Sequence, residues 1–199
     1  MKKTLLGLLL VLFCFLPFSS AFSQNKPMAK EPVLLTSCGQ SPGPVIIKVV
    51  LQKLNIPFDY NPLATAADLQ KKKSAGLPYG SVIIVMGASL KGMGAAGISI
   101  EDEIKRISQL IQEAKKENIT IIGGHVEGMK RRAQGAAAGD TTDEQSIEAV
   151  APNSDIMLIN KEGNTDGRFT TIAQSKKIPL IEVEKNVELL QALSKIYGK

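Results

Sequence analysis

Cys38 and His125 are the side chains in this sequence whose types are best suited to catalysis. Cys38 stands in TSCGQSPGP, where an apolar run stops and a helical pattern begins. A thiolate there would be favoured by the helix dipole and by free backbone N–H groups. His125 is the only histidine and follows an apolar run in GGHVEG. Together they predict either a reactive thiol with a histidine base, or two polar residues that merely end strands.

Glycine-rich segments carry a second group of candidates, suited to binding an anion. GMGAAG matches G-x-G-x-x-G, but it does not directly follow a first strand and no acid ends the next strand, which argues against a dinucleotide site. Glycine-rich turns can direct several N–H groups at one oxygen, so we expect an anion-cradling loop instead. The basic residues of KRR would suit carboxylate or phosphate. The candidate ligand-binding residues are Gln40, Ser41, Ser89, Lys91, Gly92, Gly94, Arg131, Arg132, Asn160 and Arg168.

Other chemistries are less well matched by the spacing. CGQS is locally similar to the Cys-x-x-Ser of monothiol glutaredoxins, but Pro42 and Pro44 move the helix start away from Cys38. A phosphatase loop needs arginine where Pro44 stands. One histidine and one cysteine outside the leader lack paired spacing, so no metal site is expected. No cofactor can be named. Asp166 is expected to cap a helix.

The first 23 residues predict a secretory signal peptide. Two lysines precede an apolar run over residues 5–16, which is shorter than the ~20 residues that span a bilayer. Pro17 follows, and small residues at 21 and 23 suit cleavage. Cys14 would leave with this segment; an uncleaved anchor is the alternative. We therefore expect a periplasmic or secreted protein whose single domain covers residues 30–199.

Short apolar runs alternate with amphipathic stretches through the rest of the chain. This alternation predicts an α/β fold with a doubly wound, mostly parallel sheet of five or six strands, a flavodoxin-like or Rossmann-like three-layer sandwich. Strands are expected over 32–37, 57–60, 81–87, 119–124, 155–160 and 179–184. Helices are expected over 44–55, 66–74, 99–118, 142–150, 167–177 and 187–197.

The connections in this pattern differ in length, and the difference predicts where a site lies. Helix-to-strand joints are short, whereas most strand-to-helix joints are long and rich in glycine. Joints of ~2–6 residues would suffice. Ligands of open α/β sheets bind outside the carboxyl ends of the strands, the edge that the long joints decorate. AQGAAAGD, residues 133–140, is expected to close over this edge as a lid.

The amino-acid composition limits the classes of partner that we expect. The net charge is +5, and removing residues 1–23 takes away two lysines and no acid, leaving +3. That charge is too small to imply a polyanion. Tryptophan is absent and aromatic residues make up 5% of the chain, so nucleic acid is not expected. No other apolar run is long enough to span a membrane.

Several phrases together resemble one family. TSCGQSPGP, MGASLKGMGAAGISIEDEIKR, AQGAAAGD, APNSD and GRFTTIA are similar to a family of exported bacterial proteins of about this length, catalogued as a domain of unknown function. The resemblance extends over nearly the whole chain after the leader. It implies a bacterial, exported, single-domain protein, and it assigns no catalytic or binding residue.

The leading functional hypothesis is therefore a protein that binds a small anionic ligand at the carboxyl edge of the sheet. The first alternative is a thiol-dependent enzyme or redox protein that uses Cys38 with His125 as its base. The second is a protein-interaction module that uses the loop edge as an interface.

Overall fold

The computed structural model describes residues 27–132 and 141–199. The expected signal peptide and the expected lid segment, residues 133–140, lie outside the described residues. Six strands form one sheet: β1 (Val33–Cys38), β2 (Phe58–Tyr60), β3 (Ser81–Met86), β4 (Thr120–His125), β5 (Ile156–Asn160) and β6 (Leu180–Val183). The helices are α1 (Gly43–Lys53), α2 (Ala66–Ser74), α3 (Leu90–Ala96), α4 (Ile100–Lys116), α5 (Thr142–Val150), α6 (Arg168–Lys176) and α7 (Leu189–Tyr197). Four 3₁₀ turns are η1 (Gly128–Lys130), η2 (Ala151–Asn153), η3 (Lys161–Asn164) and η4 (Asn186–Glu188).

The sheet is parallel throughout, in the order β2-β1-β3-β4-β5-β6. Its first five positions follow the flavodoxin-like order, with β6 added at one edge. The α/β sandwich expected from the alternating pattern is confirmed, and the strand order decides between the two forms of it. Successive strands are added in opposite directions on the two sides of β1: β2 lies on one side, and β3 and the later strands lie on the other. The gap between β1 and β3 is therefore the switch point where such folds usually bind ligands.

The strands are apolar because both faces of the sheet are covered. Every residue of β1, β3 and β5 is buried. Alternate side chains enter two cores: Leu34 and Ile84 pack in one, and Leu35 and Ile83 in the other. A parallel sheet buried on both faces favours such continuous apolar runs over an alternating pattern.

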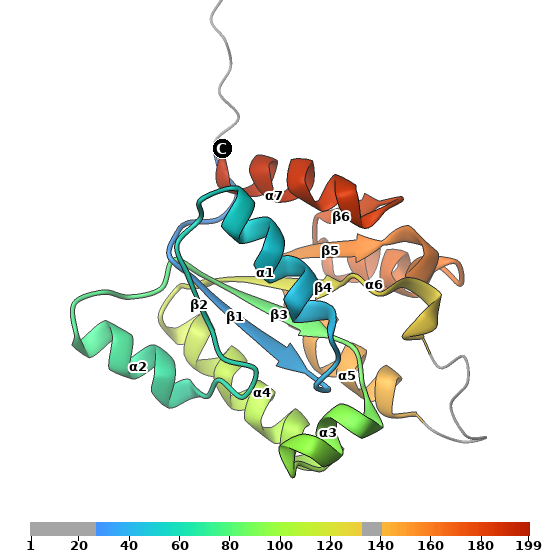
Figure 1. Ribbon diagram of the computed structural model, residues 1–199, viewed down its shortest axis with the longest axis horizontal. Coiled ribbons are helices and arrows are strands. Elements are labelled where there is room, and N and C mark those ends of the chain that lie inside the picture. Colours follow the sequence, from blue (N-terminus) through green and yellow to red (C-terminus); the bar gives the residue numbers. More distant parts are fainter. Residues whose placement is uncertain (1–26, 133–140) are drawn as a thin grey trace, which may run out of the picture.

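Helices form the two outer layers (Figure 1). Helices α1 and α7 contribute to the core on one face of the sheet, and α2, α4, α5 and α6 to the core on the other. Ser99 caps the longest helix, since its Oγ accepts a hydrogen bond from Asp102 N at 3.1 Å. Among the described residues, the structure contains no helix that could cross a membrane.

Candidate functional site

The long strand-to-helix joints all emerge at one edge of the sheet. This follows from the parallel pairing of every strand, which places all carboxyl ends on the same side. The joints after β1, β3, β4 and β5 therefore lie together, as the sequence predicts. They are packed against one another by internal contacts, and those contacts decide which side chains a ligand could reach.

The switch point between β1 and β3 is closed by backbone pairing. Gly87 N donates to Cys38 O at 3.0 Å and Ser89 N donates to Gly39 O at 2.7 Å. Gln40 and Ala88 form an isolated antiparallel bridge. A methyl group on Gly39 would lie 2.6 Å from Ala88 Cα, and the φ of Gly39 is 105°, so this position requires glycine. The crevice that usually receives a ligand is filled by the chain itself.

The segment expected to be an anion-cradling loop is instead the short helix α3. Ser89 caps the helix, and its Oγ accepts from Gly92 N at 3.1 Å. Gly92 lies against the carbonyl oxygen of Gln40, where a methyl group would overlap it, whereas Gly94 has open space around it. Glycine at 92 thus permits close packing of α3 on the β1 joint. Lys91 on the same helix is exposed.

Of the two interpretations of Cys38, the structure fits a buried strand-end residue better than a reactive thiol. Cys38 is wholly buried in the core, and its Sγ lies 3.9 Å from the carbonyl oxygen of Ser146. Burial raises the pKa of this thiol, and the negative charges of Glu103 and Asp143 raise it further. The helix dipole would favour a thiolate here only if the thiol were exposed at the turn. The side chain instead packs in the core between the sheet and the helices, where desolvation outweighs the dipole.

His125 is equally unsuited to act as a base toward Cys38. It is fully buried, and burial together with the nearby guanidinium groups lowers the pKa of its imidazole to about 3. Neither ring nitrogen has a hydrogen-bond partner among the described residues. Strand β3 separates β1 from β4, and Met86, paired with Cys38, packs in the same core as Cys38. Strands are ~4.8 Å apart, so two steps put the strands of Cys38 and His125 roughly 10 Å apart.

A buried ion pair that the sequence did not reveal holds the end of β1. Glu103 is fully buried, and its Oε1 accepts from Gly39 N at 2.8 Å and from Gln40 Nε2 at 2.8 Å. Its Oε2 accepts from Arg106 Nε at 2.9 Å. Arg106 also donates to the carbonyl oxygens of Ser37, at 2.7 Å, and Ala64. The carboxylate accepts hydrogen bonds from buried N–H groups that would otherwise have no partner inside the protein.

The remaining joint residues that the sequence singles out also make internal contacts. Gln40 donates to Pro62 O at 3.0 Å as well as to Glu103. Asn160 Oδ1 accepts from Glu162 N at 3.0 Å and so caps η3. Ser41 is buried, and its Oγ lies 3.3 Å from Gly43 N as an acceptor. These are the contacts of a packed turn, whether or not a ligand also meets them.

An internal carboxylate occupies the N-terminus of α1. Glu127 Oε1 accepts from Gly43 N, in the first turn of α1, at 3.1 Å. Its Oε2 accepts from Arg131 at 2.7 Å from Nη2 and 3.2 Å from Nε. Arg131 also donates to Ala88 O at 2.7 Å. The glutamate thus sits where an anion is stabilised by a helix N-terminus and a guanidinium. Four-residue spacing of Glu127 and Arg131 is the sequence signal that could have identified the pair.

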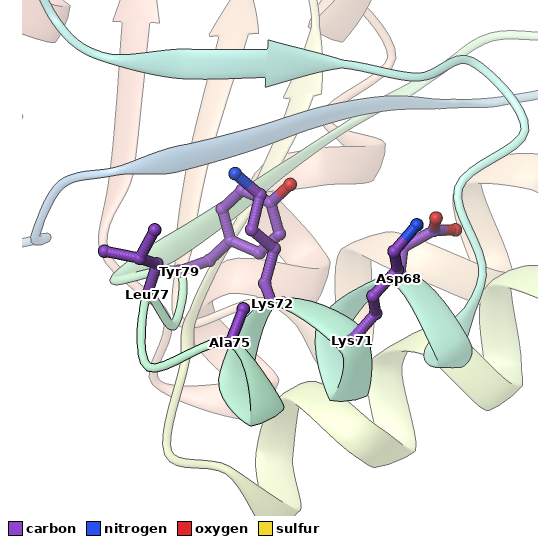
Figure 2. Close-up of a pocket in the computed structure, with 6 residues that line it drawn as sticks. All are labelled: Asp68, Lys71, Lys72, Ala75, Leu77 and Tyr79. Atoms are coloured by element: carbon purple, nitrogen blue, oxygen red, sulfur yellow. The ribbon is translucent and has the colours of Figure 1, made fainter.

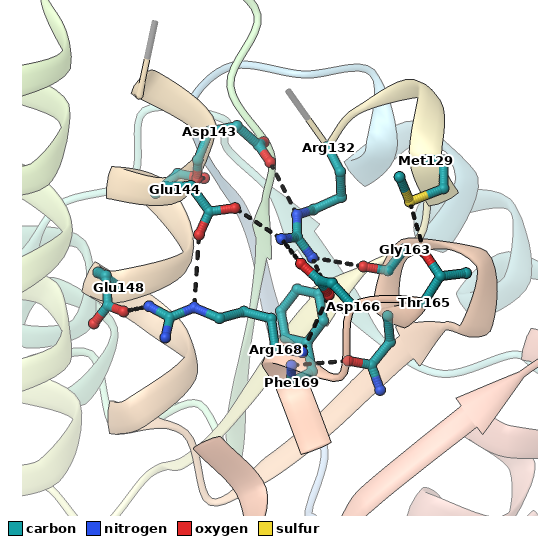
Figure 3. Close-up of polar contacts among 12 residues, drawn as sticks. Met129, Arg132, Asp143, Glu144, Glu148, Gly163, Thr165, Asp166, Arg168 and Phe169 are labelled. Atoms are coloured by element: carbon teal, nitrogen blue, oxygen red, sulfur yellow. Dashed lines mark hydrogen bonds and ion pairs between the residues drawn. The ribbon is translucent and has the colours of Figure 1, made fainter. Parts of the chain in front are cut away.

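Arg132 lies at the centre of a second cluster (Figure 3). Its Nη2 donates to Asp166 Oδ2 at 2.6 Å and to Glu144 Oε1 at 2.8 Å, and its Nη1 donates to Gly163 O at 2.7 Å. Asp143 Oδ2 lies 3.8 Å from Arg132 Nε, and neither atom has a hydrogen bond among the described residues. The carboxylates around Arg132 therefore outnumber its guanidinium, so this cluster has little positive charge left to bind an anion.

The side chains around this cluster complete its charge balance. Arg168 pairs with Glu148 and lies 3.6 Å from Glu144 (Figure 3). Asp166 Oδ1 accepts from Arg168 N at 3.1 Å, which confirms the expected capping contact. Within residues 27–132 and 141–199, no group of three or more metal-ligating acidic, histidine or cysteine side chains is arranged to hold an ion.

A family model described as a domain of unknown function, DUF6305, matches residues 30–197. The chain belongs to the DUF6305 family. The expected membership of a family catalogued as a domain of unknown function is thereby confirmed, while export stays a prediction. No curated protein matches this DUF6305 chain.

Solved structures with some likeness to the DUF6305 chain are distant. The SGNH-hydrolase family esterase AlinE4 is 14% identical, with a TM-score of 0.32, over 80% of this chain and 79% of that chain. A mutant of the same esterase gives 14% identity and a TM-score of 0.33, over 81% and 80%. The YdjI aldolase from Escherichia coli K12 is 13% identical, with a TM-score of 0.20, over 80% and 77%. Likeness at this level carries no argument about activity.

Folding shifts the pKa values of two buried groups of the DUF6305 chain in opposite directions. Burial raises the pKa of Asp143 from 3.8 to about 6, and that of His125 falls from 6.5 to about 3. The stability that Asp143 contributes is present below pH 3.8 and is lost as the pH rises through about 6. The contribution of His125 is present above pH 6.5 and is lost as the pH falls toward 3.

Between roughly pH 4 and 6 the two contributions change in opposite directions, each by about 1.4 kcal/mol per pH unit. Asp143→Asn should therefore make the free energy of unfolding rise with pH more steeply than in the wild type. His125→Leu should make it fall with rising pH. Urea unfolding at intervals of half a pH unit measures both slopes. Slopes that change in the same direction in the two variants would refute this assignment.

Proposed function

We propose that the protein is an exported binding protein that takes a small anionic ligand at the carboxyl edge of its sheet, at the N-terminus of α1 beside Arg131. One observation carries this proposal: a carboxylate of the chain itself already occupies that position. Glu127 receives hydrogen bonds there from Gly43 N and from the Arg131 guanidinium. A place that accommodates one carboxylate with helix N–H and guanidinium donors has the chemistry to accommodate another.

The contacts suggest how a ligand would enter. The side chain of Glu127 is 12% exposed and that of Arg131 is 20% exposed, so the pair lies near the surface. The ligand's anionic group would replace the Glu127 carboxylate, accept from Gly43 N and pair with Arg131. Because Glu127 competes with it, a ligand with a single carboxylate would bind weakly. Phosphate, or a dicarboxylate that makes further contacts, would compete better.

Neighbouring residues define the remainder of this proposed site. The Ser41 hydroxyl lies beside the same first turn of α1, and Gly87 leaves room for the Arg131 side chain, since a methyl group there would lie 2.9 Å from Arg131 Cγ. Lys91 on α3 is an exposed cation at this edge that makes no ion pair within the described part of the chain. Arg132 is left out, because its guanidinium is already bound by carboxylates.

Calorimetric titration with inorganic phosphate and with succinate tests the displacement. Glu127→Ala removes the internal competitor, so at least one of these anions should bind the variant about tenfold more tightly than the wild type. Adding Arg131→Gln should abolish the gain. Glu148→Gln is the matched control, because it removes a carboxylate that pairs with a different arginine, Arg168. Equal affinity in the wild type and Glu127→Ala, or a gain that survives Arg131→Gln, would contradict the proposal.

Export is part of the proposal and rests on the sequence. The basic start, the short apolar run and the small residues at 21 and 23 favour cleavage and a periplasmic or secreted location. Edman sequencing of the protein recovered from a bacterial host would test this. A mature N-terminus near residue 22 or 24 supports export, and a retained Met1 in the cytoplasm contradicts it.

The alternatives weighed from the sequence fare differently. A thiol-dependent enzyme that uses Cys38 as nucleophile and His125 as base is not favoured, because both side chains are buried and the pKa of Cys38 is raised. A protein-interaction module retains one observation in its favour. Val45 and Val49 on α1, Val187 in η4 and Leu190 in α7 are exposed, and α1 and α7 contact each other. Exposed apolar side chains on neighbouring elements are typical of interaction surfaces.

A further inference from the structure

Lysines gather at the amino edge of the sheet, opposite the proposed ligand site. In a parallel α/β fold each helix runs back against the strands, so helix C-termini lie at the amino ends of the strands. The last turns of α1, α2, α4, α6 and α7 all carry lysine, which their dipoles favour. Because these helices surround one sheet, their lysines surround one edge.

Most carboxylates of this edge are already paired. Glu31 pairs with Lys199, Asp59 with Lys72, Glu113 with Lys116 and Glu117 with Lys73. Asp155 accepts a hydrogen bond from Ile121 N at 2.8 Å. The lysines of this edge that form no ion pair among the described residues are Lys30, Lys53, Lys71, Lys115, Lys176, Lys177 and Lys195, and all are exposed. The edge therefore carries a positive excess that the modest net charge of the whole chain conceals.

Hollows of the surface lie along this edge. One of about 340 Å³ is lined by Lys71, Lys72, Leu77 and Tyr79, with Asp68 and Ala75 (Figure 2). A second, of about 390 Å³, shares Tyr79 with it and includes Lys30 and Lys73. A third, of about 320 Å³, contains Lys115. Leu77 is 65% exposed in the joint that follows α2. An exposed leucine among lysines is typical of a surface that meets both headgroups and acyl chains.

The start of the described chain lies at the same edge. Met28 N donates to Ile196 O at 2.8 Å, which holds the segment before β1 against the end of α7. The apolar run of residues 5–16 is therefore joined to the domain at its basic edge. Until the proposed cleavage removes it, an apolar run inserted in a bilayer would bring this edge toward the membrane surface.

We propose that the amino edge of the sheet is a docking surface for a membrane that contains anionic phospholipid. The cations are lysines, whose flexible stems and compact charges suit many headgroup arrangements, whereas the arginines at the carboxyl edge are fixed in ion pairs. Each lysine near an anionic bilayer adds attraction that salt screens. In this orientation the proposed ligand site faces away from the membrane.

Vesicle co-sedimentation of the full chain tests the docking surface. Vesicles of phosphatidylcholine with 30% phosphatidylglycerol are compared with pure phosphatidylcholine. The ratio of the two partition coefficients cancels the apolar contribution of residues 1–26, and comparison between variants of the same chain cancels the contribution of Lys2, Lys3 and Lys26. We expect a clear preference for the anionic vesicles at 0.1 M salt that disappears at 1 M salt, where the Debye length falls to ~3 Å. The triple variant Lys71→Gln, Lys115→Gln, Lys176→Gln should lower the preference by about 10- to 100-fold.

The matched control removes the same charge elsewhere. Lys105→Gln, Lys161→Gln, Lys185→Gln replaces three exposed lysines that lie away from the C-termini of α1, α2, α4, α6 and α7, and it should keep the preference within about threefold of the wild type. Equal loss in both triple variants would mean that net charge alone acts, and would overturn the proposal. So would the absence of any vesicle preference, including the case in which the chain binds heparin instead. Thermal melts confirm that both variants are folded.

Discussion

Replacing Glu103 by alanine should lower the free energy of unfolding by about 3–5 kcal/mol. The carboxylate is fully buried and is shared by Gly39 N, Gln40 Nε2 and Arg106. Its removal leaves a largely buried guanidinium without its counter-charge and a buried backbone N–H without an acceptor, and both are costly. Urea unfolding followed by circular dichroism measures the loss.

Two further variants separate charge from position at this site. Glu103→Gln keeps an oxygen acceptor for Gly39 N but not the charge, so its loss should be smaller than that of alanine. Glu101→Ala removes an exposed carboxylate from the first turn of the same helix, and it should change stability little. If Glu101→Ala and Glu103→Ala cost the same, the buried ion pair does not hold the β1 joint.

The second large effect concerns two glycines of one short helix. Gly92→Ala should destabilise the protein by about 1–3 kcal/mol or more, because the added methyl group would overlap the carbonyl oxygen of Gln40. Gly94→Ala, two residues further on, should instead stabilise it by about 0.5–1 kcal/mol, since it has open space and alanine favours a helix. Thermal and urea unfolding of the two variants give opposite signs on this account.

The same pair decides what the glycine motif is for. A flexible loop that cradles an anion would tolerate alanine at both positions in the absence of ligand. Two variants of unchanged stability would therefore contradict the packing role assigned to Gly92, and would restore the loop interpretation that the sequence suggested.

The fold could be predicted because its signals are local and repeated. Strands β1, β3 and β5 are mostly apolar and buried on both faces, and amphipathic helices follow them, so the alternation alone specifies parallel crossovers. The cap at Ser99 is likewise visible in a few adjacent residues. Strand order depends on contacts between distant segments, and it therefore had to come from the structure.

The candidate site was predicted less well, because burial of a polar side chain is not a local property. Cys38 precedes a helix, yet its side chain points into the core, and the dipole argument does not include that desolvation. Arg132 belongs to a basic run, yet its charge is neutralised by ion pairs with Glu144 and Asp166 from two other segments. Glu103 occupies a core position of an amphipathic helix, where a charge is not expected.

The composition also does not reveal how charge is distributed over the surface. The net charge, +5 for the whole chain and +3 without residues 1–23, suggests no strongly charged surface. Helix dipoles nevertheless favour lysines at helix C-termini, which lie at one edge of the sheet. Clustered carboxylates face Arg132 and Arg168 at the other edge. The two proposed functions therefore occupy opposite edges, and a variant of one leaves the other intact.

The backbone amide of Gly43 reports most directly on the central claim, that the N-terminus of α1 is an anion site held by Glu127. In ¹H–¹⁵N spectra of Glu127→Ala, phosphate should shift the Gly43 resonance in a saturable manner, with the Kd found by calorimetry. In the wild type the same titration should need about tenfold more phosphate. A Gly43 amide that stays unmoved in Glu127→Ala at saturating phosphate, while amides elsewhere shift, would contradict the account.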